Sequence, residues 1–274
     1  MTSTQRSLVG ARGRDIVYDV HRPDSPAVGV IALVHGLGEH AGRYGHVIQR
    51  FTDAGYVVVA PDHAGHGRSD GSLPDVTDFG DFVADLHRVI GSVERDDLPL
   101  YVVGHSMGGA IALTYTLDHP DEVTGLVLSG PALVPGEDLS PLMIKLAPLL
   151  GRVAPRLPAA ALPSSALSRD PAVVAAYDAD PLVWHGKIPA GLGGSLLAAM
   201  AEFPKRLHTL RVPVLALHGG RDALANAEGT RMVGELAGGD DVTTQVYPEL
   251  FHEIFNEPER DEVLDEVMEW LDSH

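Results

Sequence analysis

The chain of 274 residues contains no cysteine. This absence excludes disulfide bonds, thiolate metal ligands and a cysteine nucleophile, and it leaves the redox compartment open. Long apolar runs are also missing, because no stretch approaches the ~20 residues that a membrane-spanning helix needs. Residues 1–15 lack the apolar core of a signal peptide. We therefore expect a protein that is cytoplasmic or loosely associated with a membrane or cell surface.

Positive charge is scarce, with 20 lysines and arginines against 38 aspartates and glutamates and a net charge of −18. Such an acidic surface repels phosphate backbones, so we expect no nucleic-acid partner, and most of the surface should avoid anionic membranes. The hydrophobic content is nevertheless 45%. A chain of this length and composition can bury the core of one large α/β domain.

The most informative stretch surrounds Ser106. Residues 98–103 read as a buried strand, and residues 110–113 begin a helix. Between them, Gly104 and Gly108 complete the pattern G-x-S-x-G. In the context of strand, turn and helix this pattern predicts a nucleophile elbow, in which a strained serine exposes its Oγ above the carboxyl edge of a sheet.

A second G-x-S-x-G at residues 67–71 lacks that context. The residues before it do not resemble a strand, and those after it do not resemble a helix. We therefore interpret Ser69 as a loop residue.

Alternating apolar segments predict the fold. We expect buried strands at residues 14–20, 29–34, 56–60, 98–103, 125–129, 212–218 and 242–247. Between them, helices are expected at residues 44–54 and 77–94, directly after Ser106, and from near Asn256, where Glu259 completes a capping-box-like pair. Strands that alternate with helices indicate a mostly parallel sheet with helices on both faces.

The alternation stops between residues 132 and 210, a stretch rich in alanine, leucine and proline with no clear strand. One helix is predicted from Pro141 to Gly151, and Pro148 should bend or end it. A second helix is predicted at residues 191–201. We expect this segment to form an apolar cap, or lid, over the carboxyl edge of the sheet, where open α/β folds place their sites. Residues 1–131 and 211–274 would form the core of the same folding unit.

A serine nucleophile needs a base, and fourteen histidines are available. In the chain order of nucleophile, acid and base, the candidates after Ser106 are His119, His185, His208, His218, His252 and His274. His252 lies in the loop after the last predicted strand, at the carboxyl edge of the sheet. The others lie at a helix end, in or beside the cap, at a strand end or at the terminus. We therefore predict that His252 is the base.

The acid should follow a strand that lies between the nucleophile and the base. Asp222 directly follows the strand at residues 212–218, in a turn that can direct its carboxylate toward His252. The alternatives lie in cap or surface turns: Asp178, Asp180, Asp240 and Asp241. For the oxyanion hole we expect the backbone N–H of Met107, next to the nucleophile, and that of Leu37, in the glycine-rich turn after residues 29–34.

Other polar clusters give weaker signals. His63 and His66 near Asp62, or His35 and His40, could bind a metal, but neither pair has the helical H-E-x-x-H arrangement. The glycine-rich turns match neither a P-loop nor a dinucleotide fingerprint. We expect no cofactor.

Several motifs together resemble one family. They are HGLGEHAGRY at 35–44, PDHAGHGRS at 61–69, GHSMGGAIAL at 104–113, SRDP at 168–171, YDADPLV at 177–183, HGGRD at 218–222 and FHEIFNEPER at 251–260. They cover nearly the whole chain and are similar to bacterial monoacylglycerol lipases, closest to the actinobacterial, mycobacterial-type enzymes of the α/β-hydrolase superfamily.

The resemblance implies an α/β-hydrolase fold and the cofactor-free hydrolysis of monoacylglycerols to glycerol and a fatty acid, through an acyl-enzyme on Ser106. It implies the same catalytic and oxyanion-hole residues as those chosen above. It also implies that Glu39, Arg43 and Tyr177 lie near the glycerol end of the substrate. The lid is the part that matches least. Its leucines, among them Leu142, are expected to allow peripheral contact with a lipid surface.

Alternative functions remain. A general carboxylesterase or a lysophospholipase would use the same triad. A haloalkane dehalogenase needs an aspartate where this chain has Ser106. A non-catalytic binding module would not require the complete triad that the sequence predicts.

Overall fold

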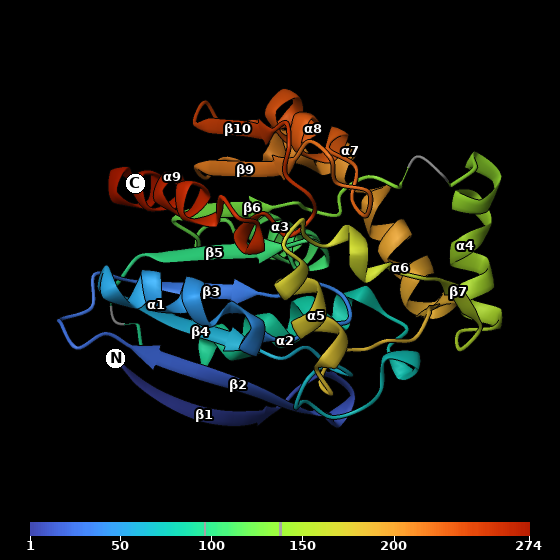
Figure 1. Ribbon diagram of the computed structural model, residues 1–274, viewed down its shortest axis with the longest axis horizontal. Coiled ribbons are helices and arrows are strands. Elements are labelled where there is room, and N and C mark those ends of the chain that lie inside the picture. The colour runs from blue at the N-terminus through green and yellow to red at the C-terminus, as the bar shows by residue number, and fades with distance from the viewer. Residues whose placement is uncertain (96, 137–138) are drawn as a thin grey trace.

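The computed structural model describes residues 1–95, 97–136 and 139–274 (Figure 1). An eight-stranded sheet, ordered β1-β2-β4-β3-β5-β6-β9-β10, forms its centre. The strands are β1 (Thr2–Val9), β2 (Asp15–Arg22), β3 (Gly29–Val34), β4 (Tyr56–Pro61), β5 (Leu100–His105), β6 (Gly125–Ser129), β9 (Val214–Gly219) and β10 (Val242–Tyr247). β1 and β2 pair antiparallel, as do β2 and β4, and the remaining pairs are parallel. The predicted mostly parallel sheet is confirmed.

Strand β3 shows how the apolar runs encode this sheet. All six of its residues are buried. Because side chains alternate along a strand, Val30, Ala32 and Val34 join the core on one face, whereas Ile31 and Leu33 join the core on the other. A strand covered on both faces has no position for a polar residue, which explains its continuous apolar sequence.

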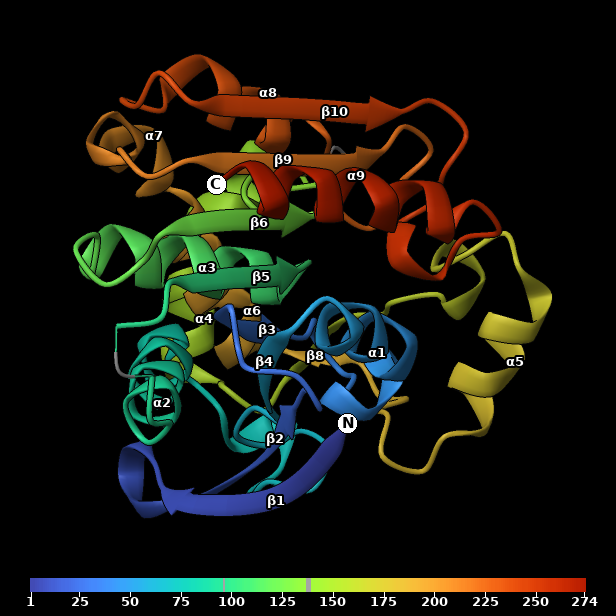
Figure 2. The same cartoon turned by 90° about the vertical axis from the view of Figure 1, so that its left-hand side faces the viewer.

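Helices cover both faces. One core contains buried residues of α2 (Phe79–Gly91), α3 (Met107–Asp118), α6 (Ala190–Met200) and α8 (Glu228–Leu236), and the other contains those of α1 (Gly45–Asp53) and α9 (Arg260–Ser273). In Figure 2 the arrowheads of β5, β6, β9 and β10 point toward the side where α5 (Pro171–Ala179) lies. The carboxyl edge of the sheet therefore faces the segment between β6 and β9.

That segment, called here the inserted segment (residues 132–210), is mostly helical. Besides α5 and α6 it contains α4 (Pro141–Val153), α7 (Phe203–Arg206) and the short paired strands β7 (Pro158–Ala160) and β8 (Ile188–Pro189). In Figure 1, α6 lies between α4 and the sheet. The boundaries of the inserted segment as a cap stay a prediction. Residues 137 and 138 within this segment lie outside the described residues.

Short 3₁₀ helices occupy several connections. They are η1 (Ala11–Gly13), η2 (Ala41–Tyr44), η3 (Leu73–Asp75), η4 (Ser164–Ala166), η5 (Leu207–Thr209) and η6 (Ile254–Asn256). η2 and η6 lie beside the site described below. Among the helices of the described residues, none combines the length and apolar character that crossing a bilayer requires.

Some local predictions were wrong. α4 begins as predicted, with Ser140 accepting a hydrogen bond from Met143 N–H and Pro141 in the first turn, but it continues through Pro148 to Val153. The C-terminal helix begins at Arg260 rather than near Asn256, and Glu259 makes no side-chain capping bond.

Other elements were missed, among them three strands. β1 has no apolar alternation, because it is an edge strand whose residues are nearly all exposed. β7 and β8 are only three and two residues long, so no periodic signal precedes them.

Candidate active site

Ser106 occupies a strained turn between β5 and α3. Its backbone has φ 55° and ψ −121°, a conformation that costs free energy in a non-glycine residue. The turn needs its glycines, because a Cβ at Gly104 would lie 2.4 Å from Gly108 O and a Cβ at Gly108 would lie 2.1 Å from Val34 O. The observed strand, turn and helix thus have the geometry of a nucleophile elbow.

Ser69 contrasts with Ser106, as predicted. It lies in a loop, and its hydroxyl donates to Asp62 O at 2.6 Å and accepts from Val17 N–H at 2.8 Å. Its side chain therefore stabilises a buried turn.

The end of β6 fixes the elbow from the other side. Ser106 N–H donates to Ser129 O at 3.0 Å, and Ala132 N–H donates to Ser106 O at 3.0 Å. His105 Nδ1 lies 2.9 Å from the same Ser129 backbone oxygen. The centroid of the His105 ring is 4.7 Å from the centroid of the His252 ring. The loop after β10 therefore brings His252 next to the elbow.

His252 pairs with Asp222. Its Nδ1 lies 2.7 Å from Asp222 Oδ2, and both side chains are almost fully buried. The other carboxylate oxygen, Oδ1, accepts from Leu224 N–H at 2.7 Å and from Ala225 N–H at 2.9 Å. Backbone donors in the turn after β9 therefore orient the carboxylate toward the imidazole.

The electrostatics of the pair agree with its geometry. Burial lowers the pKa of His252, but the charge and hydrogen bond of Asp222 outweigh burial, so the pKa is raised. Burial likewise raises the pKa of Asp222, but His252 and His218 bring that pKa well below its ordinary value. Asp222 is thus an ionised acceptor near neutral pH, and His252 Nδ1 carries the hydrogen.

His218 is a second histidine on Asp222 that sequence reasoning treated only as the end of a strand. Its Nε2 lies 3.1 Å from Asp222 Oδ2, and its Nδ1 lies 2.9 Å from Thr230 Oγ1 on α8. The ring is completely buried. The spacing in HGGRD, four residues from histidine to aspartate, was the available signal.

The turn after β3 (residues 35–38), called here the oxyanion turn because it carries Leu37, packs against the elbow. A Cβ at Gly36 would lie 3.2 Å from Ser106 Cβ. Leu37 follows in this turn, and Met107 is the first residue of α3, where a backbone N–H has no acceptor within its own helix. The two residues predicted for the oxyanion hole therefore lie on the two segments that meet at Ser106.

Glu39 and Arg43 belong to a buried ionic network. Arg43 Nη1 donates to Glu39 Oε2 at 2.6 Å and to Glu253 Oε1 at 2.6 Å, and Nη2 donates to Glu253 Oε2 at 2.7 Å. Glu39 Oε1 also accepts from Tyr44 OH and from Gly36 N–H, each at 2.6 Å. Burial raises the pKa of Glu39, but Arg43 and nearby histidines outweigh it and lower that pKa to about 2.

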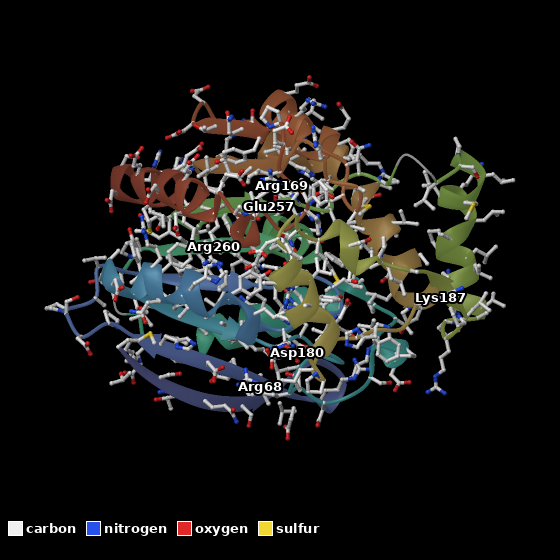
Figure 3. All side chains as sticks on the ribbon, in the orientation of Figure 1. Arg68, Arg169, Asp180, Lys187, Glu257 and Arg260 are labelled. Carbon is white, nitrogen blue, oxygen red and sulfur yellow. The ribbon has the colours of Figure 1, made fainter. Side chains whose placement is uncertain are left out.

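Tyr177 extends this network into the inserted segment. The guanidinium carbon of Arg43 lies 4.8 Å from the centroid of its ring, a cation–π distance. Tyr177 and Leu37 both line a cavity of about 270 Å³, together with Trp184, His185 and other residues between α5 and β8. Lys187, labelled in Figure 3, also lines it. The cavity thus joins the oxyanion turn to the inserted segment.

Comparison with known proteins identifies the family. A family model described as "Serine aminopeptidase, S33" matches residues 25–259. A monoacylglycerol lipase of Mycolicibacterium smegmatis is 46% identical over all of this chain and 98% of its own, and a monoglyceride lipase of Homo sapiens is 34% identical over 96% of this chain and 89% of its own. The crystal structure of the Paleococcus ferrophilus monoacylglycerol lipase has a TM-score of 0.84 at 34% identity, covering 93% of this chain and 98% of its own. The chain belongs to the monoacylglycerol lipase family of α/β-hydrolases.

In this family member, the histidines considered above as metal ligands make other contacts. His35 Nε2 accepts from His63 N–H at 3.0 Å, and His63 Nε2 lies 3.1 Å from His35 O. His66 contacts both rings, and His40 Nε2 lies 2.9 Å from Asp180 Oδ2 in the inserted segment. These rings pack and make hydrogen bonds beneath the oxyanion turn.

The network residue that sequence reasoning missed is Glu253. It lies next to His252 in the chain, but its partner Arg43 is 210 residues away. No local sequence pattern predicts a pair of residues so far apart in the chain. The only signal was the motif FHEIFNEPER itself, in which a carboxylate directly follows the predicted base.

Proposed function

We propose that this protein hydrolyses monoacylglycerols to glycerol and a free fatty acid, with Ser106 as nucleophile, His252 as base and Asp222 as acid. The observation that carries the proposal is the buried Asp222–His252 pair, 2.7 Å between Oδ2 and Nδ1, beside the strained turn that bears Ser106. The named relatives, at up to 46% identity over the whole chain, support this substrate class.

Acylation begins when Ser106 Oγ attacks the ester carbonyl carbon and its proton passes to Nε2 of His252. Asp222 accepts the Nδ1–H bond throughout and stabilises the imidazolium that forms. The tetrahedral intermediate places negative charge on the former carbonyl oxygen. This oxygen accepts hydrogen bonds from the backbone N–H groups of Leu37 and Met107. The intermediate collapses by breaking the ester C–O bond, and the imidazolium gives its proton to the departing glycerol oxygen.

Deacylation repeats the sequence with water. His252 Nε2 takes a proton from the water as the water oxygen attacks the acyl carbon. The same backbone donors stabilise the second intermediate. Its collapse releases the fatty acid, and the proton returns to Ser106 Oγ. The cycle needs no external electron donor or acceptor, and no cofactor enters any step.

The cavity beside Leu37 suits the glycerol end of a substrate, because Tyr177 and the polar groups around it can bond to hydroxyls. We assign Tyr177 to this contact. Glu39 and Arg43 do not line this cavity, and Arg43 already donates hydrogen bonds to both Glu39 and Glu253.

The inserted segment acts in this proposal as a lid that meets lipid. α4 exposes apolar side chains along its length: Leu142, Met143, Leu146, Leu149, Leu150 and Val153. Only Gly151 of this helix is buried. A contiguous apolar surface of this kind on an acidic protein favours contact with the acyl region of a lipid aggregate rather than with anionic head groups.

The deciding experiment compares kcat/KM for 1-monolaurin, 1-monoolein, a diacylglycerol and p-nitrophenyl butyrate, with Ser106→Ala as the blank. A preference for the monoglycerides over the diacylglycerol is expected. Comparable rates on all short esters with little activity on monoolein would instead indicate a general carboxylesterase. Undiminished hydrolysis by Ser106→Ala protein would overturn the mechanism.

A further inference from the structure

Arg43 joins two buried carboxylates from opposite ends of the chain. It makes one hydrogen bond to Glu39 and two to Glu253, all between 2.6 and 2.7 Å. The side chains of both glutamates are 4% exposed and that of Arg43 is 9% exposed. A guanidinium that holds a carboxylate through two parallel bonds fixes its orientation as well as its distance. We call Glu39, Arg43 and Glu253 the Arg43 bridge.

Each end of the bridge holds a different half of the site. Glu39 Oε1 accepts from Gly36 N–H, directly before Leu37, so this carboxylate braces the oxyanion turn. Glu253 directly follows His252, and its backbone N–H donates to Leu167 O at 2.8 Å. The Arg43 bridge therefore connects the segment that carries an oxyanion donor with the segment that carries the base.

The Arg43 bridge also leaves an excess of negative charge beside the base, because one guanidinium faces two carboxylates. The groups that face His252 come from several elements: Asp222 after β9, His105 at the end of β5, Glu39 after β3, and its own neighbour Glu253. Apart from the triad acid, the two bridge glutamates supply the anionic groups among them. Anionic neighbours favour a protonated imidazole over a neutral one.

We propose that the Arg43 bridge is a positioning device that sets the distance between the oxyanion turn and His252, and that its net negative charge stabilises the His252 imidazolium in the transition state. This inference rests on the proposed serine hydrolase mechanism. It assigns Glu253 a role in catalysis, as a positioning residue. It also makes Glu39 and Arg43 positioning residues rather than ligands of the glycerol group.

The hydrogen bonds that Glu39 already accepts support this distinction. Its Oε1 accepts from both Gly36 N–H and Tyr44 OH, and its Oε2 accepts from Arg43. Three of its about four lone-pair sites are thus used, and the side chain is only 4% exposed, so a substrate hydroxyl has little access to it. The same side chains can act on the reaction without touching the substrate.

The test is Glu253→Gln in the full-length enzyme, assayed on 1-monolaurin across pH. The amide keeps the size of the side chain but removes its charge. We expect kcat to fall about 10- to 100-fold with KM changed less than about twofold, as for a misplacement far from the substrate. Because a negative charge is lost, the pKa of His252 should fall and the imidazole should stay neutral to lower pH. The acid limb of the pH profile of kcat/KM should therefore move to lower pH by about half a unit or more.

Glu257→Gln is the matched control. Glu257 lies four residues further along, its side chain is fully buried, and it pairs with Arg169 at 2.5 Å; the two are labelled together in Figure 3. This pair connects the same loop to the start of α5 and does not reach the oxyanion turn. Its loss should lower the melting temperature as Glu253→Gln does, without moving the acid limb.

Arg43→Lys separates position from charge. Lysine keeps the positive charge but cannot make the forked contact to Glu253 while also reaching Glu39. We expect kcat to fall while the acid limb stays within about 0.2 unit of the wild type. This variant also keeps the test decisive if Glu253→Gln does not fold.

Two results would overturn the inference. One is an acid limb in Glu253→Gln that coincides with the wild type, and the other is an equal shift in Glu257→Gln. Wild-type kcat retained in both Glu253→Gln and Arg43→Lys would remove the positioning role. An inactive wild type would instead count against the proposed function itself, so the two failures are distinguishable.

Discussion

The sheet and helix α4 use apolar residues in opposite ways. All six residues of β3 are buried between two helical layers. On α4, by contrast, Leu142 is 66% exposed and Val153 is 76% exposed. Full burial of such a side chain contributes about 1.5–3 kcal/mol to folding. The core gains that stabilisation, whereas α4 forgoes it and leaves its apolar surface exposed, as the proposed contact with lipid requires.

This contrast teaches where substitutions should act. In the core, a changed side chain should alter folding or the chemistry that the fold positions. On α4, a changed side chain should leave folding unaltered and affect only the delivery of substrate.

The largest effect is expected at Ser106. Ser106→Ala should lower kcat by about 10⁵-fold or more because the acyl-enzyme cannot form. Its fold should be unchanged, since Ala keeps the small side chain in the same turn. Hydrolysis of p-nitrophenyl butyrate and the melting temperature measure the two quantities. Ser69→Ala, at the second G-x-S-x-G, is the control and should lose stability while retaining activity.

The next effect concerns the elbow glycine. A Cβ at Gly108 would lie 2.1 Å from Val34 O, so Gly108→Ala must displace backbone and should cost about 3 kcal/mol or more. Gly45→Ala is the matched control, because nothing lies within 4 Å of a Cβ at that position, which opens α1. Urea unfolding followed by circular dichroism compares the two. Equal stability of both variants would contradict the packing described here.

Acid should destabilise the core. Burial lowers the pKa of His35 to about 3 and that of His66 to about 4, well below the ordinary 6.5. The unfolded chain therefore binds more protons between about pH 4 and 6.5, so stability is complete above pH 6.5 and is lost as the pH falls toward 4. Each of these two histidines should lower the free energy of unfolding by about 2 kcal/mol at pH 5.

Urea titrations at pH 7 and pH 5 measure this loss. In His66→Asn protein the difference between the free energies of unfolding at pH 7 and pH 5 should be smaller, because one proton no longer binds on unfolding. An identical difference in the variant would exclude His66 as a source of the acid sensitivity.

The smallest effect should come from α4. Leu142→Ser combined with Leu146→Ser removes exposed apolar surface, so the melting temperature should change by less than about 2 °C. Hydrolysis of soluble p-nitrophenyl butyrate should be unaltered. Hydrolysis of monoolein in neutral vesicles should fall about tenfold, in proportion to weaker binding. Unchanged vesicle binding, measured by sedimentation, would sink the lipid-contact role of this helix.

The same division explains what could be predicted from the sequence. The strand at residues 29–34 was placed with correct bounds, because a strand buried on both faces is written as an unbroken apolar run. The elbow was recognisable because the two glycines that its turn requires, Gly104 and Gly108, stand together in one short motif. Asp222 and His252 were chosen from chain order, and the structure places their side chains in contact.

What was missed lacks local signals. β1 is an exposed edge strand whose residues follow no apolar alternation, and its pairing with β2 supplies its order. The contact between Arg43 and Glu253 joins residues 210 positions apart, so no sequence pattern near either residue predicts it. His218 read as the end of a strand, although its ring also reaches Asp222.

The sheet order has a consequence for the synthesis of the protein. Ser106 and the oxyanion turn belong to strands that leave the ribosome early, whereas Asp222 and His252 follow β9 and β10, which complete the sheet edge last. Because a domain folds as a unit, a chain that ends before β9 lacks both the strands that complete the sheet edge and the turns that carry Asp222 and His252. In the proposed mechanism, ester cleavage therefore requires that the last two strands of the sheet have been synthesised.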